Sequence, residues 1–409
     1  MVSHTRFLLL ASLAITSFAA PSQRWKGPPP SGSGDCGKAI YLITNDQTNS
    51  VVALPIGADG KLSNGSVTAT GGSGSNSIDS SNGMPAAPDA LVAQSSLTRA
   101  GNKIFAVNAG SNTVSMLSFD PKNPTSLKLV GQPVSLPGQF PNTVAASGKN
   151  NLVCVGTTGQ VNGVSCSTFS AQGLSAMDDL RSFDINQTTP PMGPLNTVSQ
   201  LFFSEDESRL FATVKGDPTV NNTGFFSVFP VQAPGCSGVG TLSMQDTRSS
   251  PAGTAVLFGS KIIEGTNNVF VTDASFGGAV LSVDPASNEA SLVANQTIDG
   301  QKATCWATIS KKTGSAFVTD VGVNRLVEMS LTDASILSTT DLSANGDPGL
   351  IDLVAAGNFI YALSPGNGTT PAAVSVVDVS GGQGSAKLVQ HFSLASMGVG
   401  KNAQGMALF

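Results

Sequence analysis

The sequence predicts an all-β protein, and more narrowly a seven-bladed β-propeller closed by pairing the C-terminal strand with the first blade. Three observations predict this fold. Charged residues make up 11% of the chain, and 45 of its 409 residues are glycine. A strand-turn-strand pattern recurs seven times, and the chain ends on the lone apolar run KNAQGMALF. Globular proteins contain about 25% charged residues, so this composition disfavours long solvent-facing helices and favours strands and turns.

The repeated unit is a hairpin. Each copy has an apolar strand, a polar turn rich in Asn, Asp and Gly, and a second strand with aliphatic alternation, which together are the signature of a β-hairpin. The seven copies begin at Ala39, Lys103, Asn151, Arg209, Asn268, Ser315 and Phe359. A third apolar run usually follows, such as SLKLVGQPV after the second copy. Three strands per copy are one fewer than a propeller blade contains.

The fourth strand of each blade is expected to precede its hairpin. The runs DALVAQSS, NTVAAS, NTVSQLFFS, TAVLFGS, TCWATIS and LIDLVAA come before copies two to seven. Only the first copy lacks such a run, and KNAQGMALF supplies it from the other end of the chain. Pairing the two termini in one blade removes the exposed edge that an open ring would leave. A β-sandwich, or two unrelated β-domains, is the alternative architecture, because regularly spaced short strands suit either.

The N-terminal residues have the layout of a secretory signal peptide. His4 and Arg6 precede an apolar run, and the small residues Ser17 and Ala19 suit a cleavage site. We therefore expect a signal peptide over residues 1–19, a flexible linker rich in Pro, Gly and Ser over residues 20–38, and the propeller over residues 39–409. No other apolar run approaches the ~20 residues that a membrane span needs. The expected location is extracellular, as a secreted protein or in the cell wall.

In a secreted chain, glycosylation sequons and cysteines become candidate modification sites. Five Asn-x-Ser/Thr sequons are candidate glycosylation sites on surface loops. Their asparagines are Asn64, Asn186, Asn221, Asn295 and Asn367. The cysteines also number five, so at least one is free or pairs with another molecule. Cys154 and Cys166 lie symmetrically about a glycine-rich turn, so we predict a disulfide between them, with two buried thiols on neighbouring strands as the alternative.

The charge pattern gives no sign of a nucleic-acid partner. The net charge is −5, and no cluster of Lys and Arg interleaves with aromatic residues. The chain also has no Cys-x-x-Cys and no pair of histidines at metal-binding spacing. We therefore expect no nucleic acid, no metal and no cofactor, and we expect a monomer.

Three segments resemble the repeat of a known family. PNTVAASGKNNLVCV, NTVSQLFFSEDESRLFATV and KIFAVNAGSNTVSMLSFDPKNPTSLKLV are similar to the repeat of the seven-bladed lactonase-type propellers, which include bacterial 6-phosphogluconolactonase and fungal 3-carboxymuconate cyclase. With its signal peptide, the chain resembles the secreted fungal 3-carboxymuconate cyclase-like proteins. The resemblance covers about residues 39–409 and specifies fold better than chemistry. It implies a small lactone or muconate as substrate.

The chain departs from that family where chemistry is concerned. The family's enzymes carry His near the start of inner strands, with Arg and Glu proposed to help in lactone chemistry. The corresponding positions here are Asn142 and Asn196, which can form hydrogen bonds but cannot carry a proton near neutral pH. His391 is the only histidine after the signal peptide, and we expect it half-exposed on the outermost strand of the last blade. We assign no catalytic residue.

Polar residues at strand ends are candidates for a binding site. Asp273 and Asp320 end the second strand of their blades, and Asn108 holds the equivalent position in the second copy. In a propeller these strand ends lie on the face where the tunnel opens. We predict that a polar mouth for a ligand or partner is lined by Asp89, Asn108, Asn142, Asn196, Asp273, Asp320, Arg325 and Asp347. The alternative is that each Asp after Thr caps its turn by accepting hydrogen bonds from backbone amides.

Two functions remain in view. The first is a secreted or cell-wall-associated glycoprotein that presents the propeller as a binding surface to an extracellular macromolecule, which the lack of a catalytic His, nucleophile motif or metal ligands favours. The alternative is a lactonase or carboxymuconate cycloisomerase-like enzyme that acts on a small lactone or muconate with Arg and carboxylates in place of His.

Overall fold

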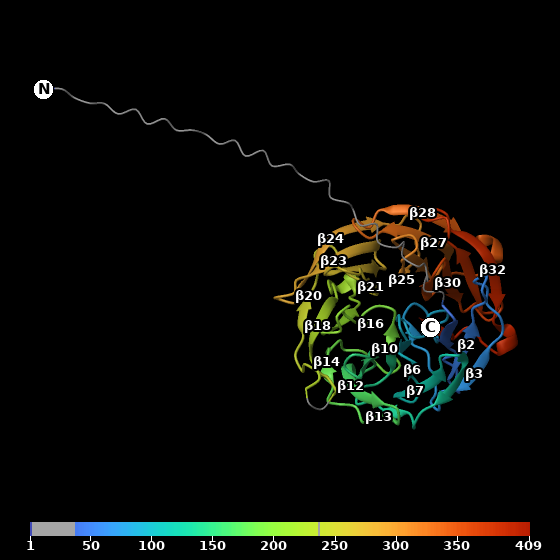
Figure 1. Cartoon of the computed structure of the whole chain (residues 1–409), viewed down its shortest axis with the longest axis horizontal. Coiled ribbons are helices and arrows are strands. Elements are labelled where there is room, and N and C mark those ends of the chain that lie inside the picture. Colours follow the sequence, from blue (N-terminus) through green and yellow to red (C-terminus); the bar gives the residue numbers. More distant parts are fainter. Residues whose placement is uncertain (2–36, 236–237) are drawn as a thin grey trace. The chain divides into compact units, whose positions relative to one another are not determined.

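Seven β-sheets form a ring in the computed structural model, which describes Met1 and residues 37–235 and 238–409 (Figure 1). The seven-bladed propeller prediction is therefore confirmed. Most of the predicted signal peptide and linker lies outside the described residues, as do Cys36 and Cys236. In the described part of the chain, no helix is long and apolar enough to cross a membrane.

Each blade has four main strands, and successive inner strands contact one another around the ring. From the inner to the outer strand, blade one is β33 (Gln404–Leu408), β1 (Ala39–Ile43), β2 (Ser50–Pro55) and β3 (Ser66–Ala69), and blade two is β5 (Leu97–Ala100), β6 (Lys103–Asn108), β7 (Thr113–Asp120) and β8 (Asn123–Leu129). In the same order, blade three is β10 (Pro141–Ser147), β11 (Leu152–Thr158), β12 (Asn162–Ser170) and β13 (Gly173–Leu174), blade four is β16 (Val198–Phe203), β17 (Arg209–Val214), β18 (Phe225–Gln232) and β19 (Thr241–Leu242), and blade five is β21 (Leu257–Ile262), β22 (Asn268–Asp273), β23 (Gly277–Val283) and β24 (Ala290–Thr297). Blade six is β25 (Thr304–Ser310), β26 (Ser315–Asp320), β27 (Val323–Ser330) and β28 (Ile336–Asp341), and blade seven is β29 (Leu353–Ala356), β30 (Phe359–Ser364), β31 (Ala373–Asp378) and β32 (Lys387–Ser393).

Shorter elements complete the fold. Strands β9 (Val134–Ser135), β14 (Arg181–Ser182) and β20 (Thr247–Ser249) add to the third strands of blades two, three and four. Strands β4 (Ile78–Asp79) and β15 (Met192–Gly193) pair in parallel outside the blades. Three short 3₁₀ helices are η1 (Pro218–Val220), η2 (Ser343–Asn345) and η3 (Ala395–Met397).

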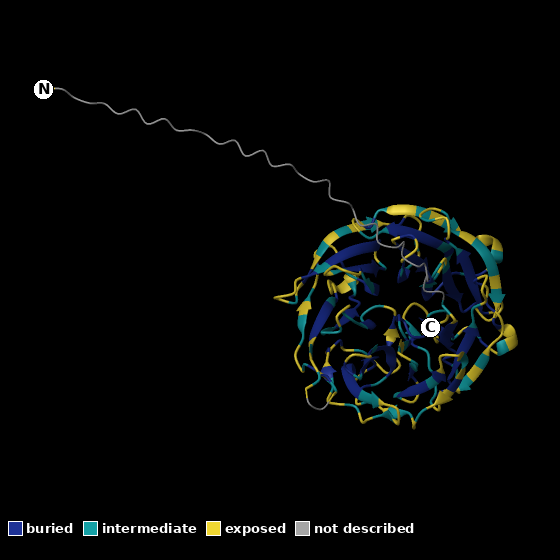
Figure 2. Ribbon diagram, in the orientation of Figure 1, coloured by how far each residue is buried: buried dark blue, intermediate teal, exposed yellow. Residues whose placement is uncertain are grey.

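The C-terminal strand closes the ring as predicted. Strand β33 pairs antiparallel with β1, with Tyr41 opposite Ala407. The second strand of each blade is almost wholly buried, whereas an outer strand such as β24 alternates between buried or half-buried and exposed residues (Figure 2). This pattern follows from packing, because inner strands are covered on both faces and outer strands on one.

One predicted inner strand is wrong. The run DALVAQSS is not a strand; the inner strand of the second blade is β5, which begins at Leu97. Residues 90–96, which we call the central segment, instead lie against the inner strands of several blades. Asp89, Val92 and Ser95 have φ angles of 49°, 49° and 67°. Left-handed backbone is costly for a β-branched residue such as Val92, so surrounding contacts must hold this segment in place.

Hydrogen bonds from four blades hold the central segment. Val144 N donates to Ser95 O over 2.8 Å in the third blade, and Gln94 N donates to Ser199 O over 2.9 Å in the fourth. Trp306 Nε1 in the sixth blade donates to Ala93 O over 3.2 Å. The Gln94 side chain donates to Ala307 O in the sixth blade (2.9 Å) and to a carboxylate oxygen of Asp352 beside the seventh (3.1 Å). The centre of the ring is therefore filled by backbone and by polar contacts.

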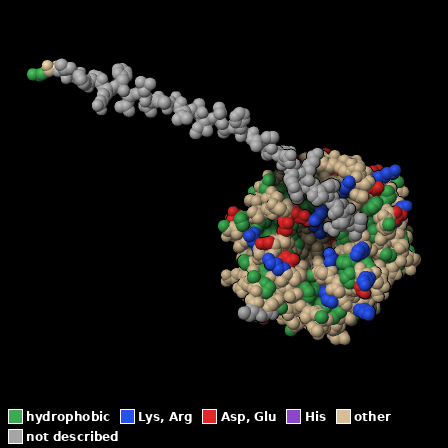
Figure 3. All heavy atoms as spheres, viewed as in Figure 1, with side chains coloured by type: hydrophobic (Ala, Val, Ile, Leu, Met, Phe, Trp, Pro, Cys, Tyr) green, Lys and Arg blue, Asp and Glu red, His purple; other side chains and the backbone are tan. Residues whose placement is uncertain are grey.

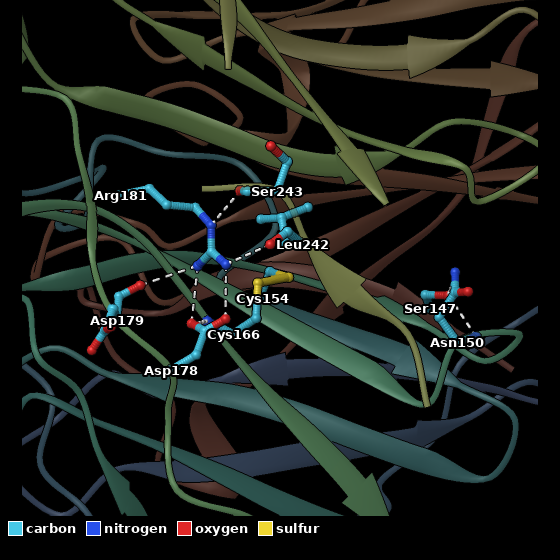
Figure 4. Close-up of a disulfide and its surroundings, with 9 residues drawn as sticks. All are labelled: Ser147, Asn150, Cys154, Cys166, Asp178, Asp179, Arg181, Leu242 and Ser243. Atoms are coloured by element: carbon cyan, nitrogen blue, oxygen red, sulfur yellow. Dashed lines mark hydrogen bonds and ion pairs between the residues drawn. A yellow bond between two sulfur atoms is a disulfide. The ribbon is translucent and has the colours of Figure 1, made fainter. Parts of the chain in front are cut away.

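The predicted disulfide is confirmed. Cys154 on β11 lies directly opposite Cys166 on β12, and their sulfur atoms are bonded (Figure 4). Beside it, the buried Arg181 guanidinium forms an ion pair with Asp178 at 2.9 Å and donates to the backbone oxygens of Leu242 and Ser243. This cluster ties the outer part of the third blade to the fourth.

A glycine beneath the central segment allows its close approach, and its replacement should destabilise the fold. A Cβ at Gly259 would lie 2.3 Å from Gln94 Oε1 and 2.5 Å from Cys305 O. We expect Gly259→Ala to lower the free energy of unfolding by about 1–3 kcal/mol, the usual cost of overpacking a core. Urea denaturation measures the change.

Gly148→Ala is the matched control, because no atom lies within 4 Å of the position that a Cβ at Gly148 would take. It should change stability by less than about 0.5 kcal/mol. Equal stability of the two variants would contradict the tight contact between Gly259 and the central segment.

Candidate functional site

Three inner strands share an extra residue at the same level of the ring. Asn142 on β10, Ser199 on β16 and Cys305 on β25 each sit at a register shift, where two residues oppose one on the next strand. Such β-bulges redirect side chains and are common next to functional sites. Two of them contact the central segment: Asn142 Nδ2 donates to Leu91 O over 3.2 Å, and Ser199 O accepts from Gln94 N over 2.9 Å.

A cavity of about 610 Å³ opens beside the first half of the central segment. Its walls come from the loop before that segment and from blades four, five and six. The apolar lining residues are Ala86, Ala87, Pro88, Val92, Pro194, Leu195, Pro218, Val256, Phe258, Ala274, Ala303 and Val321. Its ionisable residues are Asp79, Asp89, Lys215, Lys302 and Cys305. An apolar cavity with a few polar groups is the usual form of a small-molecule site.

Lys215 is the buried cation of this cavity. It directly follows β17 and is 1% exposed. Its Nζ atom donates to Val92 O over 2.7 Å and to Ser199 Oγ over 3.0 Å, and lies 4.2 Å from the centre of the Phe258 ring. Burial lowers the pKa of Lys215 to about 8, although the negative charge of Asp89 opposes this shift.

Asp89 is the acid on the same cavity whose charge acts on Lys215. The residue is half-buried, but its Oδ1 atom is shielded from solvent and has no hydrogen-bond partner among the described residues. Burial raises the pKa of Asp89 to about 7, while the charge of Lys215 and the backbone amides of Val92 and Ala93 oppose the shift. The cavity therefore holds an acid and a base that both titrate near neutral pH, a feature common at catalytic sites.

Cys305 contributes a neutral thiol. It is 5% exposed, and burial raises its pKa well above the ordinary value. The thiolate is the reactive form of cysteine, so this side chain is not a nucleophile at neutral pH. In the described part of the chain, no group of three His, Cys, Asp or Glu residues could hold a metal ion.

A smaller hollow of about 370 Å³ lies near the other end of the central segment and includes Ser95, Gln200 and Lys261. Burial lowers the pKa of Lys261, and the charge of Asp352 opposes this. Figure 3 shows basic and acidic side chains around a hollow near the middle of the face that it presents. Asp352 is occupied structurally: it accepts hydrogen bonds from Gln94, from Leu353 N and from Met406 N.

Asp89 alone among the eight predicted mouth residues lines the larger cavity. Asp273 is buried and accepts from Ala255 N and Val256 N at 2.8 and 3.0 Å. Asp320 is buried and accepts from Lys302 N at 2.7 Å. These are the hydrogen bonds expected of carboxylates that cap loops, and the loops they hold form part of the cavity wall.

The other predicted residues lie elsewhere. Asn108 is buried in a hydrogen-bond network between the first two blades, with partners that include Asn49 and Ser115. Asn142 contacts the central segment. The remaining three are placed as follows: Asn196 donates to Ile185 O, Arg325 donates to Asp299 O, and Asp347 lies 3.0 Å from His391 Nε2. His391 is on the outermost strand β32, as predicted, so Asp347 belongs to the rim of the ring.

Of the cavity's five ionisable residues only Asp89 was predicted; Asp79, Lys215, Lys302 and Cys305 were missed from the sequence. Lys215 follows the apolar strand RLFATV, one position beyond that of Asp273 and Asp320 in their blades. A single Lys at the end of a buried strand is the signal that could have identified it. Cys305 was noted only as one of five cysteines, and its role depends on a bulge that the sequence does not reveal.

All five sequon asparagines are exposed. None of them lines the larger cavity. Glycans at these positions would therefore leave its lining residues unmodified.

No family model matches the chain, and none of the curated proteins does. The similar solved structures include the periplasmic gluconolactonase of Pseudomonas aeruginosa (14% identity, TM-score 0.61, covering 90% of this chain and 99% of that one). A protein assigned as a 6-phosphogluconolactonase from Bacteroides fragilis has 11% identity and a TM-score of 0.58, covering 94% of this chain and 100% of that one. A hypothetical selenium-binding protein from Sulfolobus tokodaii has 8% identity and a TM-score of 0.57, covering 92% and 94%. At these identities the likeness shows the fold alone.

The raised pKa of Asp89 predicts a pH-dependent stability. The pKa rises from its ordinary value near 4 to about 7 on folding, so the folded protein binds more protons than the unfolded chain in this range, and stability falls as pH rises from about 4 to about 7. Asp89→Asn removes this loss. We expect its free energy of unfolding, relative to wild type, to increase between about pH 4.5 and pH 7.5, measured by urea denaturation.

Asp59→Asn, at an exposed position, is the control and should track the wild type across this range. Asp352, whose pKa burial raises to about 6, is present in all three proteins, so its contribution cancels. Parallel curves for Asp89→Asn and wild type would contradict the burial of an ionisable Asp89.

Proposed function

We propose that the chain is a lactonase-like enzyme that opens a small cyclic ester bound in the larger cavity. The observation that carries the proposal is that Asp89 and Lys215 line the same cavity and influence each other's charge, each with a pKa moved towards neutrality. The fold shared with proteins described as lactonases favours the same substrate class.

The two groups suit the two needs of ester hydrolysis. Above pH 7 the Asp89 carboxylate can take a proton from a water molecule that attacks the carbonyl carbon. Below pH 8 the Lys215 ammonium supplies positive charge for the oxygen that becomes negative. The ring C–O bond then breaks, and the proton held by Asp89 passes to the leaving ring oxygen. This assignment replaces the Arg and carboxylate set expected from the sequence.

A carboxymuconate as substrate would use the same residues. Cycloisomerisation moves a proton to or from carbon, for which Asp89 is the group of suitable pKa, and a substrate carboxylate could pair with Lys302 at the cavity. Turnover of a lactone compared with turnover of a carboxymuconate distinguishes these two reactions.

We also propose that the protein is extracellular and glycosylated, as the signal peptide layout suggests. The exposure of every sequon asparagine supports this. The five exposed positions also favour a second candidate function, a glycoprotein that presents the outer surface of the propeller to a macromolecular partner. That role does not need the cavity, so cavity variants would leave it unchanged.

Hydrolysis of lactones tests the proposal. Purified protein should open glucono-1,5-lactone, 6-phosphogluconolactone or muconolactone, measured by the acid released. Asp89→Asn should lower kcat by about 10²–10⁴-fold, the usual contribution of a general base. The profile of kcat/KM against pH should rise through about 7 as Asp89 loses its proton and fall through about 8 as Lys215 loses its charge.

Asp79→Asn is the matched control and should retain most activity. Asp79 is a carboxylate on the same cavity, but hydrogen bonds from Ser81 lower its pKa, so it is a weaker base than Asp89. Rates no greater than those in buffer for all three lactones would overturn the enzyme proposal. Equal activity of Asp89→Asn and wild type would overturn the role of Asp89.

A further inference from the structure

Lys215 is an amine whose close contacts are all uncharged. In the described part of the chain, no carboxylate lies within ion-pair distance of its Nζ atom. Its hydrogen-bond partners are Val92 O and Ser199 Oγ. Ser199 gives its own hydrogen to Leu257 O over 2.8 Å, so it accepts from Lys215. Both partners are therefore acceptors.

Two acceptors match a neutral amine. A neutral amine has two N–H groups and one lone pair, so it can satisfy both acceptors and keep the lone pair free. An ammonium has a third hydrogen, for which the site offers the face of the Phe258 ring, 4.2 Å away. That ring and the charge of Asp89 favour the ammonium, but burial is the larger effect and lowers the pKa of Lys215 to about 8. A desolvated lysine in an apolar pocket is a recognised nucleophile for carbonyl compounds.

We propose that Lys215 forms a reversible imine with a small aldehyde or ketone that carries a carboxylate and enters the larger cavity. This chemistry uses the cavity of the proposed function but does not depend on lactone hydrolysis.

The remaining groups of the cavity suit each step. The Nζ lone pair attacks the carbonyl carbon, a C–N bond forms, and the carbonyl oxygen takes a proton from Asp89 to give a carbinolamine. The nitrogen then passes a proton to the Asp89 carboxylate, which gives it to the hydroxyl oxygen. The C–O bond breaks, one water molecule leaves, and the nitrogen lone pair completes an iminium C=N bond. Loss of the remaining N–H proton to Asp89 gives the imine and restores the protonated acid. No oxidant or reductant is consumed. Asp89, with its buried and unpartnered Oδ1 atom, is the group placed to exchange these protons.

The other ionisable groups define the ligand class. Cys305, the second group whose charge acts on Lys215, stays a neutral thiol because burial raises its pKa. Lys302 lines the same cavity and is exposed, so it can pair with a carboxylate on the ligand without the cost of burying its charge. Apolar walls at Val256 and Val321 favour a short carbon chain. The ligand chemistry that fits is a small oxo acid.

Reductive trapping tests the imine. The full-length protein is incubated with glyoxylate or propionaldehyde and sodium cyanoborohydride, and the labelled peptides are quantified by mass spectrometry. Each adduct adds the probe mass less one oxygen atom. At about pH 7.5 the Lys215 peptide should carry at least about tenfold more adduct than the peptide of Lys122, because an ordinary lysine has a pKa near 10.4 and is almost wholly protonated. Lys122 is exposed and is measured in the same sample.

Variants separate the roles. Lys215→Met keeps an apolar side chain against Phe258 and should abolish the selective adduct. Asp89→Asn should slow labelling of Lys215 without moving the adduct to other lysines. Lys302→Ala should lower labelling by glyoxylate but leave labelling by propionaldehyde unchanged.

Labelling of Lys215 no greater than that of Lys122 in the folded wild-type protein, from about pH 6 to pH 9, would overturn the proposal without relying on any variant. If the protein hydrolyses a lactone but shows no selective adduct at Lys215, the imine proposal is wrong and the lactonase proposal stands. A selective adduct in a protein that opens no lactone supports the imine and removes the lactonase.

Discussion

The backbone of the central segment, residues 90–96, is the constraint on which the rest of the structure depends. It lies away from water, so its peptide groups need partners from the protein. Val144, Ser199 and Trp306 supply such partners from three different inner strands. The spacing of those strands is thereby fixed at the centre of the ring. The segment also holds non-glycine residues at positive φ, at a cost of about 1–3 kcal/mol each, which the surrounding hydrogen bonds must offset.

The same segment contributes to the wall of the larger cavity through Val92. Asp89 directly precedes the segment, and Lys215 Nζ donates to Val92 O within it. With the segment in place, both groups lie at the edge of a low-dielectric region where the charged form of each is disfavoured. The pKa of Asp89 is raised and the pKa of Lys215 is lowered, so both values lie near neutral pH. The segment therefore lies beside both groups whose pKa values burial shifts.

The blades, their closure and the Cys154–Cys166 disulfide could be predicted because each rests on local pattern: alternating apolar residues, turn chemistry and symmetry about a hairpin. The central segment could not be predicted, because the apolar residues of DALVAQSS are buried equally well in an inner strand and in a segment that fills the centre of the ring. The sequence pattern therefore does not distinguish the two. The strand-end position of Asp273 was predictable, but the hydrogen bonds that its carboxylate accepts from Ala255 N and Val256 N depend on the loop that leads into strand β21. Lys215 is buried by residues more than a hundred positions away in the chain, such as Val92.

The fold alone leaves the chemistry open, since rings of similar shape are described as a gluconolactonase and as a hypothetical selenium-binding protein. The chemistry must therefore be argued from the cavity, and there the protonation of Lys215 would decide between the two reactions proposed above. As an ammonium it can stabilise negative charge on an ester oxygen, and as a neutral amine it can attack a carbonyl carbon. Because burial brings its pKa to about 8, both forms are present near neutral pH. Asp89 can serve either reaction, as a base when it is ionised and as an acid when it is protonated. Which reaction a ligand would undergo then depends on the ligand's own carbonyl group: an ester has a leaving group and can be hydrolysed, whereas an aldehyde or ketone has none and can instead condense with the amine.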